Sequence, residues 1–128
     1  MRHYSRGFTL IELLVVVAIL GIISAVSVVS YSGYKASAEK KQAEITLNTI
    51  YLAEQEYKSN NGEYYINTST SNIVTNLFDG VDDLSEQAYS FKTTNANTLS
   101  IIATKKTNSS CTITITETNK KANVSNSC

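Results

Sequence analysis

The hydrophobic pattern begins with a long uncharged run near the N-terminus. No charged residue occurs between Glu12 and Lys35, and residues 13–34 are crowded with Leu, Ile, Val and Ala as far as Val29. About 20 residues of apolar helix cross the hydrocarbon core of a bilayer. The run is therefore long enough to span a membrane, and we expect its serines to bond back to helix carbonyls.

This run is predicted to belong to one long helix over residues 8–59, which contain no proline. Past the run, apolar residues recur every seven positions and form one stripe on the helix. The main stripe consists of Ala36, Ala43, Ile50 and Tyr57, with Leu47 beside them. We expect it to cover the domain's own sheet. Gly62 is suited to the left-handed conformation that ends helices.

A weaker stripe lies on nearly the opposite side of the helix and consists of Ala38, Ile45 and Leu52. A helix with two apolar stripes needs two partners. The second stripe either meets neighbouring subunits or is a chance pattern of three residues.

The C-terminal half carries strand patterns. Alternation of apolar and β-branched residues with polar ones fits a half-buried antiparallel sheet. The predicted strands are residues 88–93, 98–104 and 111–116, with a short edge strand at 122–125. Turns are expected at 79–80, 95–97 and 107–110, and residues 63–86 have weak periodicity. The fold class is therefore predicted to be α+β.

The overall charge is balanced, with 11 Lys and Arg against 11 Asp and Glu, so only the position of charge is informative. Arg2, His3 and Arg6 precede the apolar run, and such basic residues hold a leader on the cytoplasmic side of a membrane. A cleavable secretory signal is the alternative. It needs a shorter apolar core, and Ser24–Ala25–Val26 is a poor cleavage site.

Two cysteines, Cys111 and Cys128, lie near the C-terminus. An even pair beyond an export signal predicts one disulfide in an oxidising compartment. Two free thiols in a reducing cytosol are the alternative.

The most specific motif is Gly7–Phe8–Thr9–Leu10–Ile11–Glu12–Leu13–Leu14. Here the sequence resembles the type IV pilin family, which includes the related pseudopilins of type II secretion. The resemblance is near complete over residues 5–25, looser through the helix at 52–57 and 61–64, and only architectural afterwards. It implies a pilin fold, with a long N-terminal helix on a small antiparallel sheet and a C-terminal disulfide between Cys111 and Cys128.

The resemblance also implies how the N-terminus is processed. A prepilin peptidase would cut between Gly7 and Phe8 and then N-methylate Phe8. Residues 1–7 are the expected leader peptide, and 8–34 the transmembrane and polymerisation half of the helix. Residues 35–128 are the expected globular head domain, including the amphipathic half of the helix.

Glu12 places a carboxylate inside the apolar run, which costs roughly 2.5–3.5 kcal/mol on insertion scales and is usually functional. The resemblance implies that Glu12 pairs with the Phe8 amino group of an adjacent subunit in a filament. The alternative places Glu12 among hydrated lipid headgroups. The chain departs from many pilins in one respect, because it lacks the helix-breaking proline that they carry about where Val29 lies.

Two charged clusters are weak candidate sites. A basic patch of Lys105, Lys106, Lys120 and Lys121 would neutralise DNA phosphates, although lysines in turns are more often solvated. Acidic side chains at Asp79, Asp82, Asp83 and Glu86 would suit calcium, although their spacing does not match an EF-hand and a solvated loop is the plainer interpretation.

No catalysis and no cofactor are predicted, because the only histidine, His3, lies in the leader. The resemblance implies a structural subunit that polymerises into an extracellular filament for adhesion, twitching motility or DNA uptake. Before assembly it would sit in the bacterial inner membrane, with the leader cytoplasmic and the head periplasmic. Its expected partners are other pilins, prepilin peptidase, the pilus assembly machinery and the membrane, and further DNA or host surfaces. The alternatives are a minor pilin acting as a DNA or surface receptor, a type II secretion pseudopilin, and an anchored periplasmic domain.

Overall fold

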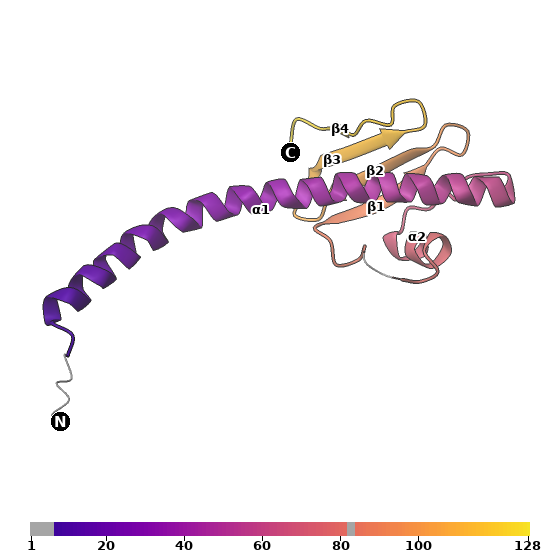
Figure 1. Ribbon diagram of the computed structural model, residues 1–128. Coiled ribbons are helices and arrows are strands. Elements are labelled where there is room, and N and C mark those ends of the chain that lie inside the picture. The colour runs from indigo at the N-terminus through magenta and orange to yellow at the C-terminus, as the bar shows by residue number, and fades with distance from the viewer. Residues whose placement is uncertain (1–6, 82–83) are drawn as a thin grey trace, which may run out of the picture. The chain divides into compact units, whose positions relative to one another are not determined.

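The computed structural model describes residues 7–81 and 84–128, apart from the side chains of Val29 and Ser30 (Figure 1). In chain order its elements are α1 (Leu10–Asn61), α2 (Thr70–Leu77), β1 (Tyr89–Thr94), β2 (Ser100–Lys105), β3 (Asn108–Thr116) and β4 (Asn123–Val124). The chain divides into two compact units, one ending at Ser37 and the other running from Ala38 to Cys128. Helix α1 contributes to both.

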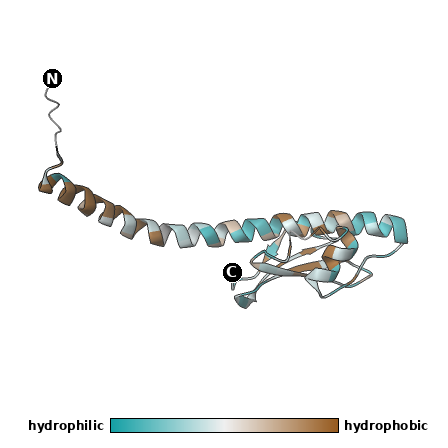
Figure 2. Ribbon diagram, turned by 90° about the horizontal axis from the view of Figure 1, so that it is seen from below, coloured by the Kyte–Doolittle hydropathy of each residue, from teal (hydrophilic) through white to brown (hydrophobic). Residues whose placement is uncertain are grey.

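The N-terminal half of α1 leaves its apolar side chains uncovered. The exposed fractions of its large apolar residues run from 48% at Val16 to 90% at Leu10. Figure 2 shows the beginning of this stretch mostly in the hydrophobic colour, with paler turns between. By length and composition alone it is sufficient to cross a membrane. The hydroxyls of Ser24 and Ser27 donate to the carbonyls of Leu20 and Ile23, at 2.7 and 2.8 Å, as expected.

In the second unit, the C-terminal half of α1 lies across one face of a four-stranded antiparallel sheet (Figure 1). The strand order is β1-β2-β3-β4, so each strand pairs with its neighbour in sequence. Ala103 in β2 stands opposite Phe91 on one side and Ile113 on the other, and all three are buried. The side chains of Ala43, Leu47 and Ile50 on α1 complete this core. The α+β fold predicted from the sequence is confirmed.

The two stripes on α1 have different surroundings. Ala43, Leu47 and Ile50 of the main stripe are buried against the sheet, as predicted, and Tyr57 is half-buried. Ala36 is exposed, so its predicted place against the sheet is wrong: it lies in the first unit, before the part of α1 that belongs to the head. In the weaker stripe, Ile45 and Leu52 are 61% and 67% exposed, so the fold of the second unit does not cover them. That this stripe meets a neighbouring subunit stays a prediction.

Two local predictions differ from the structure. The turn expected at 107–110 is shorter, because β3 begins at Asn108, which pairs with Lys105 across a register shift after Thr104. Helix α2 was not predicted. It is only eight residues long and buries Ile73 and Val74, too short a pattern to distinguish from a loop.

The predicted disulfide joins Cys111 to Cys128. Cys111 is buried in β3, so the bond ties the chain end to the core. Ser125 adds polar contacts beside it, since its N–H donates to the Thr112 carbonyl at 2.9 Å and its hydroxyl accepts from the Thr112 N–H at 3.0 Å.

Helix α1 ends where the sequence predicts. Asn61 is its last residue, and Gly62 follows with φ of +85°. The Gly62 N–H donates to the Lys58 carbonyl at 2.8 Å and so satisfies one of the carbonyls at the helix end.

We expect Gly62→Ala to destabilise the head by roughly 1–2 kcal/mol, because an L side chain is disfavoured at positive φ. A Cβ at this position would meet no atom within 4 Å, so the effect would come from the backbone alone. Thermal unfolding of the full chain in detergent measures it. Gly62→Asn should lose less, because Asn tolerates this conformation. Gly33→Ala, which also places a Cβ in open space, should not destabilise the head, and equal losses for Gly33→Ala and Gly62→Ala would contradict the argument.

Candidate functional site

The candidate site is the first turn of α1, where a polar pair closes the helix end. The Thr9 carbonyl accepts from the Leu13 N–H at 3.3 Å, and the Thr9 hydroxyl oxygen accepts from the Glu12 N–H at 3.3 Å. In return, Glu12 Oε2 accepts from the Thr9 N–H at 3.1 Å and from the Thr9 hydroxyl at 2.9 Å. This reciprocal arrangement is a capping box. It satisfies backbone donors that the first turn of a helix would otherwise leave unpaired.

The capping box uses only one oxygen of the carboxylate. Both donations from Thr9 reach Glu12 Oε2. Within residues 7–81 and 84–128, Oε1 accepts no hydrogen bond, and the side chain is exposed. Glu12 therefore holds its own helix end and still presents an acceptor oxygen to a group from outside the chain.

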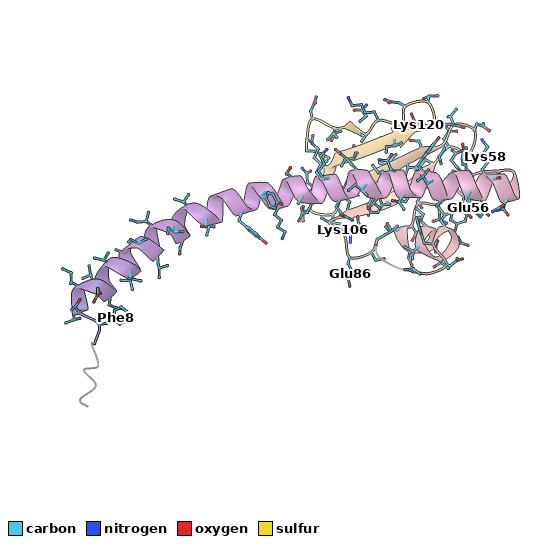
Figure 3. All side chains as sticks on the ribbon, viewed as in Figure 1. Phe8, Glu56, Lys58, Glu86, Lys106 and Lys120 are labelled. Atoms are coloured by element: carbon cyan, nitrogen blue, oxygen red, sulfur yellow. A yellow bond between two sulfur atoms is a disulfide. The ribbon has the colours of Figure 1, made fainter. Side chains whose placement is uncertain are left out.

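The residues before Thr9 are accessible. Phe8 is 85% exposed, as Figure 3 shows at the start of α1, and a side chain added at Gly7 would meet nothing within 4 Å. The bond between Gly7 and Phe8 therefore lies in open chain next to the helix. Arg2, His3 and Arg6 lie outside the described residues.

Comparison with known proteins agrees with this N-terminal arrangement. Residues 2–28 match the family profile described as "Prokaryotic N-terminal methylation motif". The chain is similar to a fimbrial protein of Neisseria meningitidis serogroup B, strain MC58, with 37% identity over 59% of this chain and 44% of the relative. It is also similar to the type IV major pilin protein PilE of Neisseria gonorrhoeae, with 45% identity over 52% of this chain and 36% of the relative. The type IV major pilin protein PilA of Myxococcus xanthus is 37% identical over 47% of this chain and 27% of the relative.

The chain is therefore similar to type IV pilins over its N-terminal half, where it also carries the methylation motif. The matched stretch spans less than half the length of each of these relatives. No solved structure is significantly similar to the chain.

The four lysines of the predicted basic patch are not brought together by the fold. Lys105 and Lys106 lie at the β2–β3 turn, whereas Lys120 and Lys121 follow the other end of β3. Nine strand residues separate the two pairs, or about 30 Å. Figure 3 labels Lys106 and Lys120 in these two places.

Several of these lysines also have local partners. The Lys105 Nζ is 3.6 Å from a carboxylate oxygen of Glu39, and the Lys106 Nζ donates to the Ser85 carbonyl at 2.6 Å. Lys120 lies over the Tyr51 ring, 5.7 Å from its centroid. The sequence places four lysines in the C-terminal half, but the topology of the sheet separates them into two pairs.

The acidic candidate site is described only in part. Asp79 lies in the turn after α2 with φ of +50°, next to Gly80 with φ of +80°, as the turn signal predicts. Asp82 and Asp83 lie outside the described residues. Among the residues that are described, no three His, Cys, Asp or Glu side chains are grouped so that they would hold a metal ion. Calcium binding by this loop stays a prediction.

Two features of the structure are not predicted from the sequence. The Thr9–Glu12 box has a local signal, since Thr followed by Glu three residues later is the capping pattern. Glu54 has a signal in its spacing, since it lies seven residues after Leu47 and so on the predicted buried stripe, but a glutamate is not expected in a core. Glu54 is fully buried in the head.

We expect Thr9→Ala to loosen the first turn of α1 by about 1 kcal/mol, the usual cost of losing a helix cap. Hydrogen exchange at the Glu12 amide, measured on the full chain in detergent, should then be about fivefold faster. The matched control is Ser24→Ala, which removes a hydroxyl that bonds back to its own helix and caps nothing. Unchanged exchange at Glu12 in Thr9→Ala would rule out the capping role.

Proposed function

We propose that this chain is a structural, non-catalytic subunit of a type IV pilus that polymerises through the N-terminal half of α1. The observation that carries the proposal is the uncovered apolar surface of that half, from Leu10 to Val28. Such a surface requires lipid or other helices around it. The similarity to proteins named as fimbrial protein and type IV major pilin supports the same assignment.

The proposed path starts in the inner membrane of a bacterium. The basic leader, residues 1–7, stays on the cytoplasmic side, and the head from residue 35 onward lies in the periplasm. A prepilin peptidase cuts between Gly7 and Phe8 and N-methylates Phe8. The accessible chain around Gly7 and the exposed Phe8 support this step. The apolar helix of residues 8–34 remains on the mature subunit and enters the extracellular filament.

Assembly exchanges lipid contacts of α1 for contacts with other pilin helices. Lipid tails are as apolar as leucine, so burial of apolar surface gives little preference for one register over another. Polar pairs supply that preference, because a buried charge without a partner is strongly penalised.

Glu12 is the proposed polar partner. Its Oε2 stays on the Thr9 donors of its own helix. Its Oε1 then accepts from the amino group of Phe8 in an adjacent subunit, a charge-assisted bond. Oε2 thus caps the end of its own helix, whereas Oε1 sets the axial register between neighbouring subunits.

The head offers a second contact between subunits. Ile45 and Leu52 project from α1 on the side away from the sheet core and are mostly exposed. In a filament these side chains would pack on the neighbouring subunit. The periodic pattern in the sequence and the exposure in the structure both support this contact.

The pilus role predicts where the chain is found. Filaments sheared from cells and imaged by electron microscopy should contain this chain by mass spectrometry, with methylated Phe8 as its first residue. A chain that stays in the membrane fraction while sheared filaments lack it would overturn the proposal.

Glu12→Val should allow membrane insertion but lower the filament yield by more than about tenfold, because the Phe8 amine of the neighbour loses its buried partner. Counting sheared filaments against membrane-bound chain measures this. Glu56→Val, on an exposed position of α1 in the head, is the control and should leave the yield unchanged. Normal filaments from Glu12→Val would disprove the pairing role.

A further inference from the structure

Helix α1 places one carboxyl group inside the head. Glu54 lies one turn beyond Ile50 on the buried stripe and exposes 0% of its surface. Its Oε2 accepts from the Tyr65 N–H at 2.8 Å. Its Oε1 is also buried and has no hydrogen-bond partner among the residues that the structure describes. An orphaned polar atom in a core is costly, so this carboxyl group needs an explanation.

The Glu54 carboxyl group binds the chain between α1 and α2. We define residues 63–69, between Gly62 and α2, as the connecting segment. On its sheet side the connecting segment is fixed by Thr93 of β1. The Thr93 hydroxyl donates to the Tyr65 carbonyl at 2.8 Å and accepts from the Asn67 N–H at 2.8 Å. The Thr93 N–H donates to the Asn67 carbonyl, also at 2.8 Å.

On its helix side, the backbone of the connecting segment is held by the Glu54 carboxyl group through Tyr65. The remaining contacts with α1 are between side chains. Gln55 donates to the Tyr64 hydroxyl at 3.0 Å, and the Tyr57 and Tyr65 rings lie 5.5 Å apart. The backbone of the connecting segment is thus anchored to the sheet through Thr93 and to the helix through one titratable group, while Tyr64 is buried in the core.

Burial raises the pKa of Glu54 to about 7, and the Tyr65 N–H bond opposes this rise only in part. The surrounding elements carry further ionisable side chains. These are Tyr51, Glu56, Tyr57 and Lys58 on α1, Glu63, Tyr64 and Tyr65 on the connecting segment, Tyr89 and Lys92 on β1, and Glu117 after β3. The Lys58 Nζ lies 3.7 Å from a Glu117 oxygen and 4.1 Å from the centroid of the Tyr64 ring. The Tyr64 hydroxyl donates to the same Glu117 oxygen at 2.8 Å. Lys58, Tyr64 and Glu117 are thus engaged with one another, and desolvation has the largest influence on the pKa of Glu54.

We propose that Glu54 is a latch, which keeps the connecting segment against α1 while its carboxyl group is protonated and lets the segment open when the group ionises. Gly62, at positive φ, is the hinge at the start of the connecting segment. The bonds from Thr93 keep the far side in place, so the movement is local and the sheet stays intact.

The direction of the pH effect follows from the two states. In the open state Glu54 faces water and titrates near its ordinary value of 4.5, whereas in the closed state its pKa is about 7. The closed state therefore binds the proton more tightly. The closed state is favoured most below pH 4.5. Its population relative to the open state falls as the pH rises to about 7 and does not change further above that. Over this window the closed-to-open ratio falls by about a hundredfold.

Hydrogen exchange read by NMR on the full chain in detergent tests the latch. The protection factor of the Tyr65 amide, which corrects for the intrinsic pH dependence of exchange, should fall by about a hundredfold between pH 4.5 and 7.5. The Thr93 amide should change by less than about threefold, because its bond to Asn67 lies on the sheet side. Glu54→Gln should remove the pH dependence at Tyr65. Glu56→Gln, two residues along the same helix and exposed (Figure 3), should keep it.

Three outcomes would overturn the latch: pH-independent protection at Tyr65 in the unaltered chain, a parallel fall at Thr93, or an unchanged pH dependence in Glu54→Gln. If Glu54→Gln does not fold, the carboxyl carbon of Glu54 is followed by NMR in the unaltered chain. A titration midpoint near 7 supports the latch, and one near 4.5 overturns it.

Discussion

Uncovered apolar surface on the first half of α1 is the constraint from which the rest of the structure follows. Large side chains from Leu10 to Val28 stay mostly exposed. A helix satisfies its own backbone hydrogen bonds along its length, so it tolerates lipid, and only its ends need partners. At the start, Thr9 and Glu12 supply these partners. The backbone of this segment is thus satisfied, but its apolar side chains are uncovered, which suits lipid or other helices.

The head differs from this segment because its apolar side chains are buried, but in a small core. Its core consists of one stripe of α1, one face of β1, β2 and β3, two residues of α2, and Tyr64, Leu84 and Leu99 from the connections. Domains of this size bury a limited fraction of their surface, and many use covalent bonds to compensate. The Cys111–Cys128 bond closes a loop with a sequence separation of 17 and adds about 3 kcal/mol in the chain-entropy model. It fixes the chain end, which β4 alone, with two residues, would hold weakly.

The sequence predicts those features whose cause is local. The length of the apolar run identifies the exposed half of the helix, and a seven-residue repeat identifies its buried face with Leu47 and Ile50. Alternation of apolar and polar residues identifies the strands. Gly62 marks the helix end because its backbone conformation requires it. What could not be predicted depends on tertiary contacts. Helix α2 forms because Ile73 and Val74 reach the core, and the lysine pairs separate because β3 lies between them. The spacing places Glu54 on the buried face, seven residues after Leu47, but its hydrogen bond to the Tyr65 N–H depends on how the connecting segment folds back.

Glu12 and Glu54 show how the surroundings decide what one chemical group does. Each lies near an end of α1, and each uses a single oxygen to accept from a backbone N–H, that of Thr9 or of Tyr65. In each case the second oxygen has no partner in the described chain. The second oxygen of Glu12 is open to its surroundings, so a positive group from another molecule can reach it and add binding energy. That of Glu54 is sealed in the core, where only a proton can relieve the cost of burial. The first carboxyl group is therefore suited to recognition between subunits, and the second to sensing pH within one subunit.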